Sequence, residues 1–141
     1  MTRFGIRADD PRVRHCSRQK VILYAILELP IAARFEPFLL GKLAVVSFQT
    51  VAELRLLALR RGWGDRRTTE IDLRLERATV APATDQIVRR WAALMYEQMR
   101  VGSRVEVGDA WVAATALVYG CPVLTNDRKD FERIAGLRLL P

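Results

Sequence analysis

Hydrophobic and polar positions along the chain fall into short blocks that predict strands followed by helices. Residues 21–24 (VILY) and 43–48 (LAVVSF) are apolar runs with the length and composition of buried strands, although a short apolar run does not by itself exclude a helix. Residues 122–125 (PVLT) and 137–140 (LRLL) are two further strand candidates. The pattern therefore predicts a buried sheet built from short strands.

Helical spacing of apolar residues follows the second of these runs directly. Val51, Leu54 and Ala58 recur every three to four residues, which places them on one face of a helix. Thr50 is suited to cap the N-terminus of that helix, and Gly62 is suited to end it. We expect this helix to pack against the sheet through its apolar face.

Two further helices are predicted in the middle of the chain. Residues 69–77 are ambiguous, because their apolar residues alternate as in a strand while the flanking charges suit an exposed helix; we favour the helix. The clearest amphipathic helix lies within residues 83–100, and its predicted packing face is formed by Ile87, Trp91, Leu94, Met95 and Met99.

The C-terminal third continues the alternation of helices and strands. Residues 109–119 are small and apolar and predict a mostly buried helix closed by Gly120, and residues 128–134 predict a short helix. Strands that alternate with helices indicate an α/β fold with a central, mostly parallel sheet flanked by helices. We expect one such domain over residues 21–141, preceded by a polar, basic and poorly ordered extension over residues 1–20.

Composition adds a basic charge and removes several classes of protein. The formal net charge is +7, and 20 of the 23 basic residues are arginine, which suits a polyanionic partner such as nucleic acid. A solvated arginine-rich surface explains the same composition, so both interpretations stay open. Cys16 and Cys121 are too few for a disulfide framework and indicate a reduced, cytoplasmic protein. No apolar run approaches the roughly 18 residues of a membrane helix.

The candidate chemistry of the chain is carboxylate chemistry. The only histidine is His15, in the polar extension, which argues against a histidine ribonuclease, and the glycine-rich phosphate-binding motifs GxGxxG and GxxxxGK[ST] are absent. Three acids follow predicted strands or open a helix: Glu53, Asp109 and Asp127. Such positions converge at the carboxyl edge of a parallel sheet. Carboxylates gathered there repel one another unless a hard cation such as Mg²⁺ lies between them.

Each acid also has a purely structural explanation. Glu53 and Thr50 match the capping box T-x-x-E, and Asp109 can be an N-cap or first-turn acid favoured by the helix dipole. Asp127 can form a turn while Asp130 caps the short helix. The three tryptophans are interpreted as core or interface anchors rather than base-stacking platforms: Trp63, Trp91 and Trp111.

The combination of motifs resembles a known family. The segments SFQTVAEL (47–54), DAWVAATAL (109–117) and PVLTNDRKDF (122–131), with GLRLL after them, look like the successive signatures of PIN-domain proteins, specifically VapC-type toxins of bacterial toxin–antitoxin pairs. The resemblance implies a PIN-like α/β fold, an acidic pocket for Mg²⁺ or Mn²⁺, and cleavage of single-stranded RNA. It also implies a cognate antitoxin and a homodimer. Matched residue by residue, it assigns metal binding and catalysis to Glu53, Asp109 and Asp127, with Thr125 and Asn126 in support.

The N-terminal motif departs from the family. Members open with an apolar strand that runs into an aspartate, whereas here Tyr24 stands at that position. Three explanations stay open: a degenerate toxin that binds without cleaving, a pocket completed by Asp9 or Asp10, and an altered reading frame upstream.

These observations leave three functional hypotheses. The leading one is a metal-dependent endoribonuclease in which a metal-activated water cleaves RNA. The alternative is a catalytically degenerate PIN domain that acts as an antitoxin-binding module, which Tyr24 favours. A third is a protein that binds nucleic acid through its arginines alone.

Overall fold

The computed structural model describes residues 21–24, 43–76 and 78–140 of the 141-residue chain. The predicted extension over residues 1–20, with Asp9, Asp10, His15 and Cys16, lies outside the described residues. The remaining predictions can be compared with the structure element by element.

A four-stranded sheet with parallel pairing throughout forms the centre of the fold, as the alternation of strands and helices predicts. Its spatial order is β3-β2-β1-β4, and β1 (Val21–Tyr24) pairs in parallel with β2 (Leu43–Ser47) and with β4 (Val123–Leu124). The outer strand β3 (Thr79–Ala81) pairs with β2. The sequence gives no periodicity for a strand of three residues, and β3 was therefore missed.

The predicted last strand over residues 137–140 is wrong in extent. Only Leu139 forms a bridge, to Val123. The Val123 N–H donates to the carbonyl of Arg138 at 2.9 Å, and the Leu140 N–H donates to the carbonyl of Val123 at 2.9 Å. The pairing is therefore limited to Val123, one of the two residues of β4.

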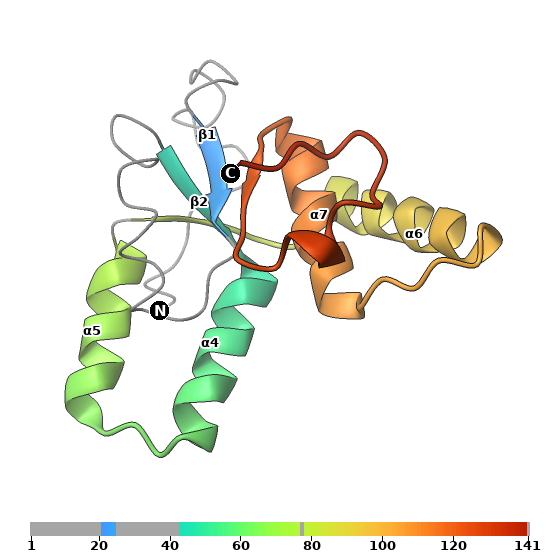
Figure 1. Ribbon diagram of the computed structural model, residues 1–141. Helices are drawn as coiled ribbons and strands as arrows, with labels where there is room; N and C mark the ends of the chain where they lie inside the picture. The colour runs from blue at the N-terminus through green and yellow to red at the C-terminus, as the bar shows by residue number, and fades with distance from the viewer. Residues whose placement is uncertain (1–20, 25–42, 77, 141) are drawn as a thin grey trace.

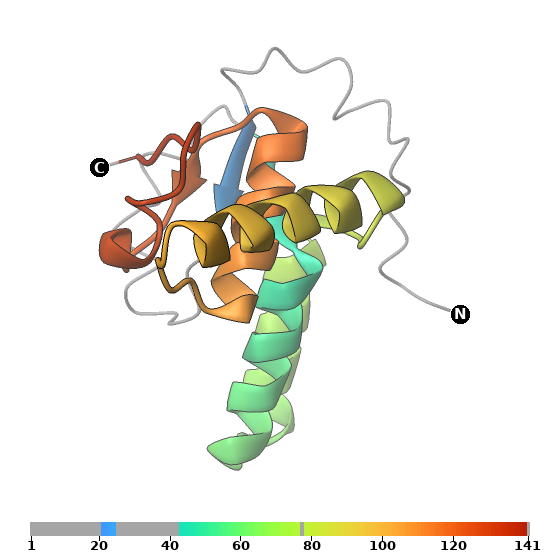
Figure 2. The same ribbon diagram turned by 90° about the vertical axis from the view of Figure 1, so that its right-hand side faces the viewer.

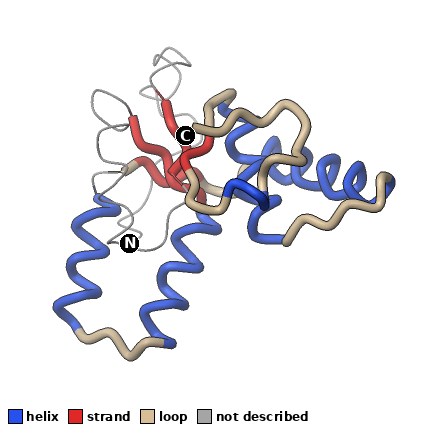
Figure 3. Tube along the Cα trace, viewed as in Figure 1, coloured by secondary structure: helices blue, strands red, loops and turns tan. Residues whose placement is uncertain are grey.

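The described residues form four α-helices, which lie to one side of the sheet or extend from it (Figure 3). Two of them, α6 (Asp85–Arg100) and α7 (Val107–Tyr119), pack against each other beside it. The other two, α4 (Phe48–Arg60) and α5 (Asp65–Glu76), run side by side as a hairpin that extends away from the sheet (Figures 1 and 2). The predicted helix over residues 69–77 is thus confirmed as part of α5. The short helix expected at 128–134 is reduced to a 3₁₀ helix, η3 (Arg128–Asp130), followed by turns.

Within the part of the chain that the structure describes, two clusters of buried side chains hold these elements together. The main cluster lies between the sheet, α6 and α7 and includes Val45, Leu94, Ala113 and Val123. A smaller cluster joins the two helices of the hairpin and consists of Leu54, Ala58, Ile71 and Leu75. None of the helices in the described part of the chain combines the length and apolar character that a membrane crossing requires.

The packing face of α6 differs from the prediction at its end. Ile87 and Leu94 are buried, but Met99 is 76% exposed and Gln98 is buried instead. Gln98 lies four residues after Leu94, whereas Met99 is rotated a further 100° around the helix, away from the buried stripe. Periodicity therefore placed the face correctly, and the apolar character of Met99 was misleading.

Candidate active site

The candidate site lies at the carboxyl edge of the parallel sheet, where three strands end together. β1 ends at Tyr24, whose backbone is in register with Leu124 at the end of β4, and β2 ends at Ser47. The chain continues from β2 directly into α4, and from β4 into the loop that holds Asp127. This edge is where α/β sheets bind their ligands.

Ser47, not Thr50, caps helix α4. The Ser47 hydroxyl is fully buried and accepts a hydrogen bond from the backbone N–H of Thr50 at 3.1 Å. Thr50 lies within the first turn, where its own hydroxyl lies 3.2 Å from that of Ser47. The capping box expected for Thr50 and Glu53 is therefore wrong, because the helix begins at Phe48 and Glu53 follows its first turn. The structural explanation for Glu53 is removed.

Glu53 is instead held between α4 and the start of α7. Its Oε1 accepts a hydrogen bond of 2.8 Å from Nε2 of Gln49, one turn earlier. A Cβ atom added at Gly108 would lie 2.5 Å from Glu53 Oε1 and 3.0 Å from Gln49 Nε2. The absent side chain at Gly108 thus allows the Glu53 carboxylate to approach the first turn of α7. Sequence reasoning missed both Gln49 and Gly108.

Asp109 lies in the first turn of α7 and is the most perturbed acid of the site. The helix begins at Val107, so Asp109 is a first-turn residue and not the N-cap, which is Glu106. The pKa of Asp109 is raised from 3.8 to about 6, first by burial and then by repulsion from Asp130, Glu53, Glu106 and Asp127. Burial and all four neighbouring acids disfavour the charged form of Asp109.

The loop after β4 supplies the remaining predicted residues. Thr125 is buried, and its Oγ1 accepts a hydrogen bond of 3.1 Å from the backbone N–H of Asp127. Asn126 and Asp127 are exposed. The buried Thr125 therefore fixes the turn that carries Asp127.

Asp130 belongs to the electrostatic surroundings of Asp109, which the sequence did not indicate. Its predicted role was to cap the short helix, but the residue before η3 is Asp127, which makes no side-chain capping hydrogen bond. Of the four carboxylates that repel Asp109, Asp130 acts most strongly. The periodicity of residues 128–134 contains no signal for this proximity, because it depends on how the loop folds back onto α7.

The chemistry of these donors fits a hydrated divalent cation better than a cation fully enclosed by protein. Among the described residues, no three His, Cys, Asp or Glu side chains are grouped closely enough to hold a metal ion. Mg²⁺ commonly keeps several waters and uses one or two carboxylates together with substrate phosphate. The Glu53 carboxylate lies against Gly108, the neighbour of Asp109, and repels the Asp109 carboxylate, so these two acids satisfy that smaller requirement.

An aromatic stack supports the helix that carries Asp109. The rings of Trp91 and Trp111 stack with centroids 4.6 Å apart, and Phe48 meets Trp111 edge to face at 5.3 Å. These rings connect α6, α7 and the first residue of α4. Trp91 and Trp111 thus serve as packing anchors, as the sequence predicts.

The parallel sheet and the acids at its carboxyl edge define the chain as a PIN domain. The PIN-domain family pattern matches residues 20–137, and the chain belongs to that family. Within it, the chain is a VapC-type toxin domain.

Two curated relatives and one solved structure illustrate the similarity. The chain is 33% identical over 90 residues to Ribonuclease VapC5 of Mycobacterium tuberculosis (strain ATCC 25618 / H37Rv), and the match covers 62% of this chain and 65% of that protein, slightly under two thirds. It is 30% identical over 123 residues to Ribonuclease VapC1 of Haemophilus influenzae (strain R2866), which covers 84% of this chain and 90% of that protein.

The structural similarity concerns the fold. The crystal structure of VapBC2 from Rickettsia felis bound to a DNA fragment from their promoter contains a chain that matches with a TM-score of 0.73 at 18% identity. The match covers 85% of this chain and 96% of that chain.

Proposed function

We propose that the protein is a metal-dependent endoribonuclease and the toxin of a toxin–antitoxin pair. Glu53 and Asp109 bind Mg²⁺ or Mn²⁺ directly, Asp127 acts on the ion through the waters that it keeps, and Thr125 and Asn126 support the loop beside them. A divalent cation bound there supplies an activated water and a counter-charge for the phosphodiester. Both curated relatives are named ribonucleases, which supports RNA as the substrate.

The observation that carries this proposal is the electrostatic state of Asp109. A half-buried carboxylate whose pKa is raised to about 6 by burial and by four other acids is held in a region of negative potential. Such an arrangement is unfavourable without a cation and favourable with one, since a cation attracts each carboxylate and so offsets their mutual repulsion. Perturbed carboxylates at a sheet edge are typical of functional sites.

The residues of the chain have separable roles in this proposal. Gln49 orients Glu53 through the 2.8 Å hydrogen bond to Oε1, and Thr125 orients Asp127 through its backbone. The arginines provide the positive charge that retains the polyanionic substrate. The similarity to a VapBC complex supports an antitoxin as the protein partner, and we also propose a homodimer in the cytoplasm.

The first experiment measures cleavage of single-stranded RNA with Mn²⁺ or Mg²⁺, for the wild type and for Asp109→Asn. We expect a loss of more than about 100-fold in rate in the variant, because a neutral amide cannot replace an anionic oxygen ligand. Asp85→Asn is the matched control. Asp85 is also a first-turn acid, but it is exposed and pairs with Arg89 on α6 at 2.7 Å. Equal loss in both variants, or in neither, contradicts the proposal.

A second function is favoured by one specific observation. Tyr24 ends the central strand β1, beside the end of β4, at the position where the family carries an aspartate. The alternative is therefore a catalytically degenerate PIN domain that binds the antitoxin without cleaving RNA. Tyr24→Asp separates the two functions. RNA cleavage that appears only in this variant identifies the degenerate module, whereas cleavage by the wild type rejects it.

A further inference from the structure

The turn of the α4–α5 hairpin concentrates positive charge. Residues 60–67 contain four arginines and a single acid: Arg60, Arg61, Arg66, Arg67 and Asp65. All four arginines are exposed, and the side chain of Arg66 is 94% exposed. We call these four arginines together with Trp63 the hairpin tip. The remaining acids of α5 lie further along the helix, at Glu70, Asp72 and Glu76, so that the positive charge is greatest at the tip.

The backbone at the tip is fixed by a glycine-terminated helix end. Gly62 has a φ of +59°, and its N–H donates to the carbonyl of Leu59 at 3.2 Å. The N–H of Trp63 donates to the carbonyl of Ala58 at 3.0 Å. This pair of bonds is the Schellman motif, which turns the following residue back against its own helix. Trp63 accordingly packs against the cluster between α4 and α5.

Trp63 in turn places two of the arginines. The guanidinium carbon of Arg67 lies 5.2 Å from the centroid of the Trp63 ring, and that of Arg61 lies 5.9 Å from it. Cation–π contacts at these distances restrict the arginine side chains without neutralising their charge. Fewer rotamers are therefore lost when the guanidinium groups bind an anion.

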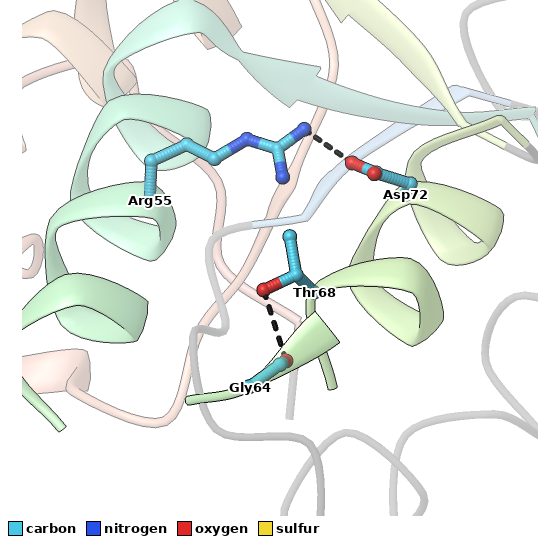
Figure 4. Close-up of polar contacts among 4 residues, drawn as sticks. All are labelled: Arg55, Gly64, Thr68 and Asp72. Atoms are coloured by element: carbon cyan, nitrogen blue, oxygen red, sulfur yellow. Dashed lines mark hydrogen bonds and ion pairs between the residues drawn. The ribbon is translucent and has the colours of Figure 1, made fainter. Parts of the chain in front are cut away.

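The hairpin that carries the tip is itself cross-linked. Arg55 on α4 forms an ion pair with Asp72 on α5, and the Thr68 hydroxyl donates to the carbonyl of Gly64 at 3.2 Å where α5 begins (Figure 4). The Arg55–Asp72 ion pair and the buried cluster of Leu54, Ala58, Ile71 and Leu75 hold α5 against α4, whereas the Thr68–Gly64 bond stabilises the first turn of α5. The tip is thus held at a fixed distance from Glu53, the acid of the candidate site that lies on α4.

We propose that the hairpin tip binds the phosphate backbone of single-stranded RNA and positions the strand whose scissile bond lies at the acidic site. This inference rests on the proposed function, because it assigns the same substrate to a second surface. From Glu53 to Arg60, seven residues further along α4, the helix rises about 10 Å at 1.5 Å per residue, a separation that a few extended nucleotides bridge. Arginine is the residue best suited to phosphate, since its planar fork donates two parallel hydrogen bonds.

The acidic site alone does not attract RNA, which gives the tip a defined purpose. Asp109 lies among four other carboxylates, and these repel a phosphodiester until a cation is present. A separate basic surface can hold the strand through its charge, without reading its sequence. Trp63 packs against the hairpin cluster, but Leu59 beside the tip is 80% exposed, so an anionic lipid surface is the competing ligand that the test has to distinguish from RNA.

The test compares two double variants with equal loss of charge. Arg66→Gln with Arg67→Gln removes two cations from the tip, and Arg89→Gln with Arg100→Gln removes two exposed cations from α6. Like Arg66, which lies 3.8 Å from Glu70, each control arginine forms an ion pair within its own helix. Binding of a labelled single-stranded RNA of about 20 nucleotides is measured by fluorescence anisotropy in EDTA, so that cleavage does not interfere.

We expect the tip variant to bind RNA roughly 10- to 30-fold more weakly at about 0.1 M salt, and its log–log salt slope to fall by about 1.4, which is 0.7 for each lost phosphate contact. The control should stay within about twofold of the wild type. Thermal unfolding of both variants verifies the fold. Equal weakening in both variants, or no RNA binding by the wild type, overturns the inference.

Two further measurements separate the possible failures. RNA that is bound through the tip but never cleaved in Mn²⁺ contradicts the proposed nuclease function and leaves the tip assignment intact. Cleavage by the wild type together with unchanged RNA binding in the tip variant supports the nuclease function and contradicts the tip assignment. Anionic phospholipid vesicles are the competing ligand, and neutral vesicles are their control. If the tip variant loses binding to anionic vesicles and not to RNA, the tip is a lipid-binding surface and the inference is wrong.

Discussion

The charged carboxylate of Asp109 is destabilised in the folded protein. Its pKa is raised to about 6 by burial first, and then by repulsion from Asp130, Glu53, Glu106 and Asp127. An acid whose pKa is higher in the folded state than in the unfolded state stabilises the fold while it is protonated. That contribution is therefore present below about pH 4 and is lost as the pH rises through about 6.

We therefore predict that Asp109→Asn makes the metal-free protein more stable at neutral pH. In EDTA, its free energy of unfolding should exceed that of the wild type by about 1–2 kcal/mol at pH 8, after allowance for solvent screening. The difference should shrink as the pH is lowered toward 5, because Asp109 becomes protonated. Denaturant unfolding across this pH range measures it. A wild type as stable as the variant at every pH would show that Asp109 bears no unfavourable charge. Asp85→Asn, which removes an exposed acid, should give no such gain.

Gly108 is the second decisive residue, because the space it leaves is filled by the Glu53 carboxylate. An alanine there would place Cβ 2.5 Å from Glu53 Oε1, so that the end of this flexible side chain must move. The helix itself should benefit, since alanine is favoured over glycine by about 1 kcal/mol within a helix. Site geometry and fold stability are thus expected to change in opposite directions.

Gly108→Ala is predicted to weaken Mn²⁺ binding about 10- to 100-fold, the range typical of disturbed ligand orientation, while the unfolding temperature stays equal or rises. Calorimetric titration with Mn²⁺ measures the first quantity and thermal unfolding the second. Gly64→Ala is the matched control, because a Cβ at Gly64 meets nothing within 4 Å. Unchanged affinity in Gly108→Ala would remove Glu53 from the metal site.

At the scale of elements, α4 connects the sheet to both proposed surfaces. Its N-terminus is fixed by the buried Ser47, its second turn carries Glu53, and its C-terminus turns at Gly62 into the hairpin tip. Sequence reasoning placed this helix correctly and ended it correctly at Gly62. It selected the wrong cap, because Ser47 and Thr50 are both good capping residues and only the end of β2 decides which of them precedes the helix.

Ser47→Ala should destabilise the protein by about 1–2 kcal/mol, since it removes a buried cap and leaves the Thr50 N–H without its acceptor. Thr69→Ala, an exposed change on α5, is expected to stay within about 0.5 kcal/mol of the wild type. Denaturant midpoints compare the two. A Ser47→Ala variant as stable as Thr69→Ala would mean that α4 does not depend on this cap.

At the scale of the whole molecule, the site is assembled by a sheet whose spatial order differs from its chain order. β1 lies between β2 and β4, which brings Tyr24 at the end of β1 beside Leu124, 100 positions later in the chain. Parallel pairing directs all these strand ends to one edge, and α7 returns to that edge through its packing on α4 and α6. The hairpin then extends from the same edge (Figure 1).

The sequence by itself determined the class of fold, most of the helices, the three candidate acids and the family, because periodicity, turn residues and motif spacing are local properties of the chain. The acids Glu53, Asp109 and Asp127 were identified by their positions after strands or at a helix start. The tertiary structure alone decided that Gly108 accommodates Glu53, that Asp130 acts on Asp109, and that Trp63 gathers arginines at the hairpin tip. These are contacts between segments distant in the sequence, and they depend on strand order and helix packing, for which no local pattern gives a signal.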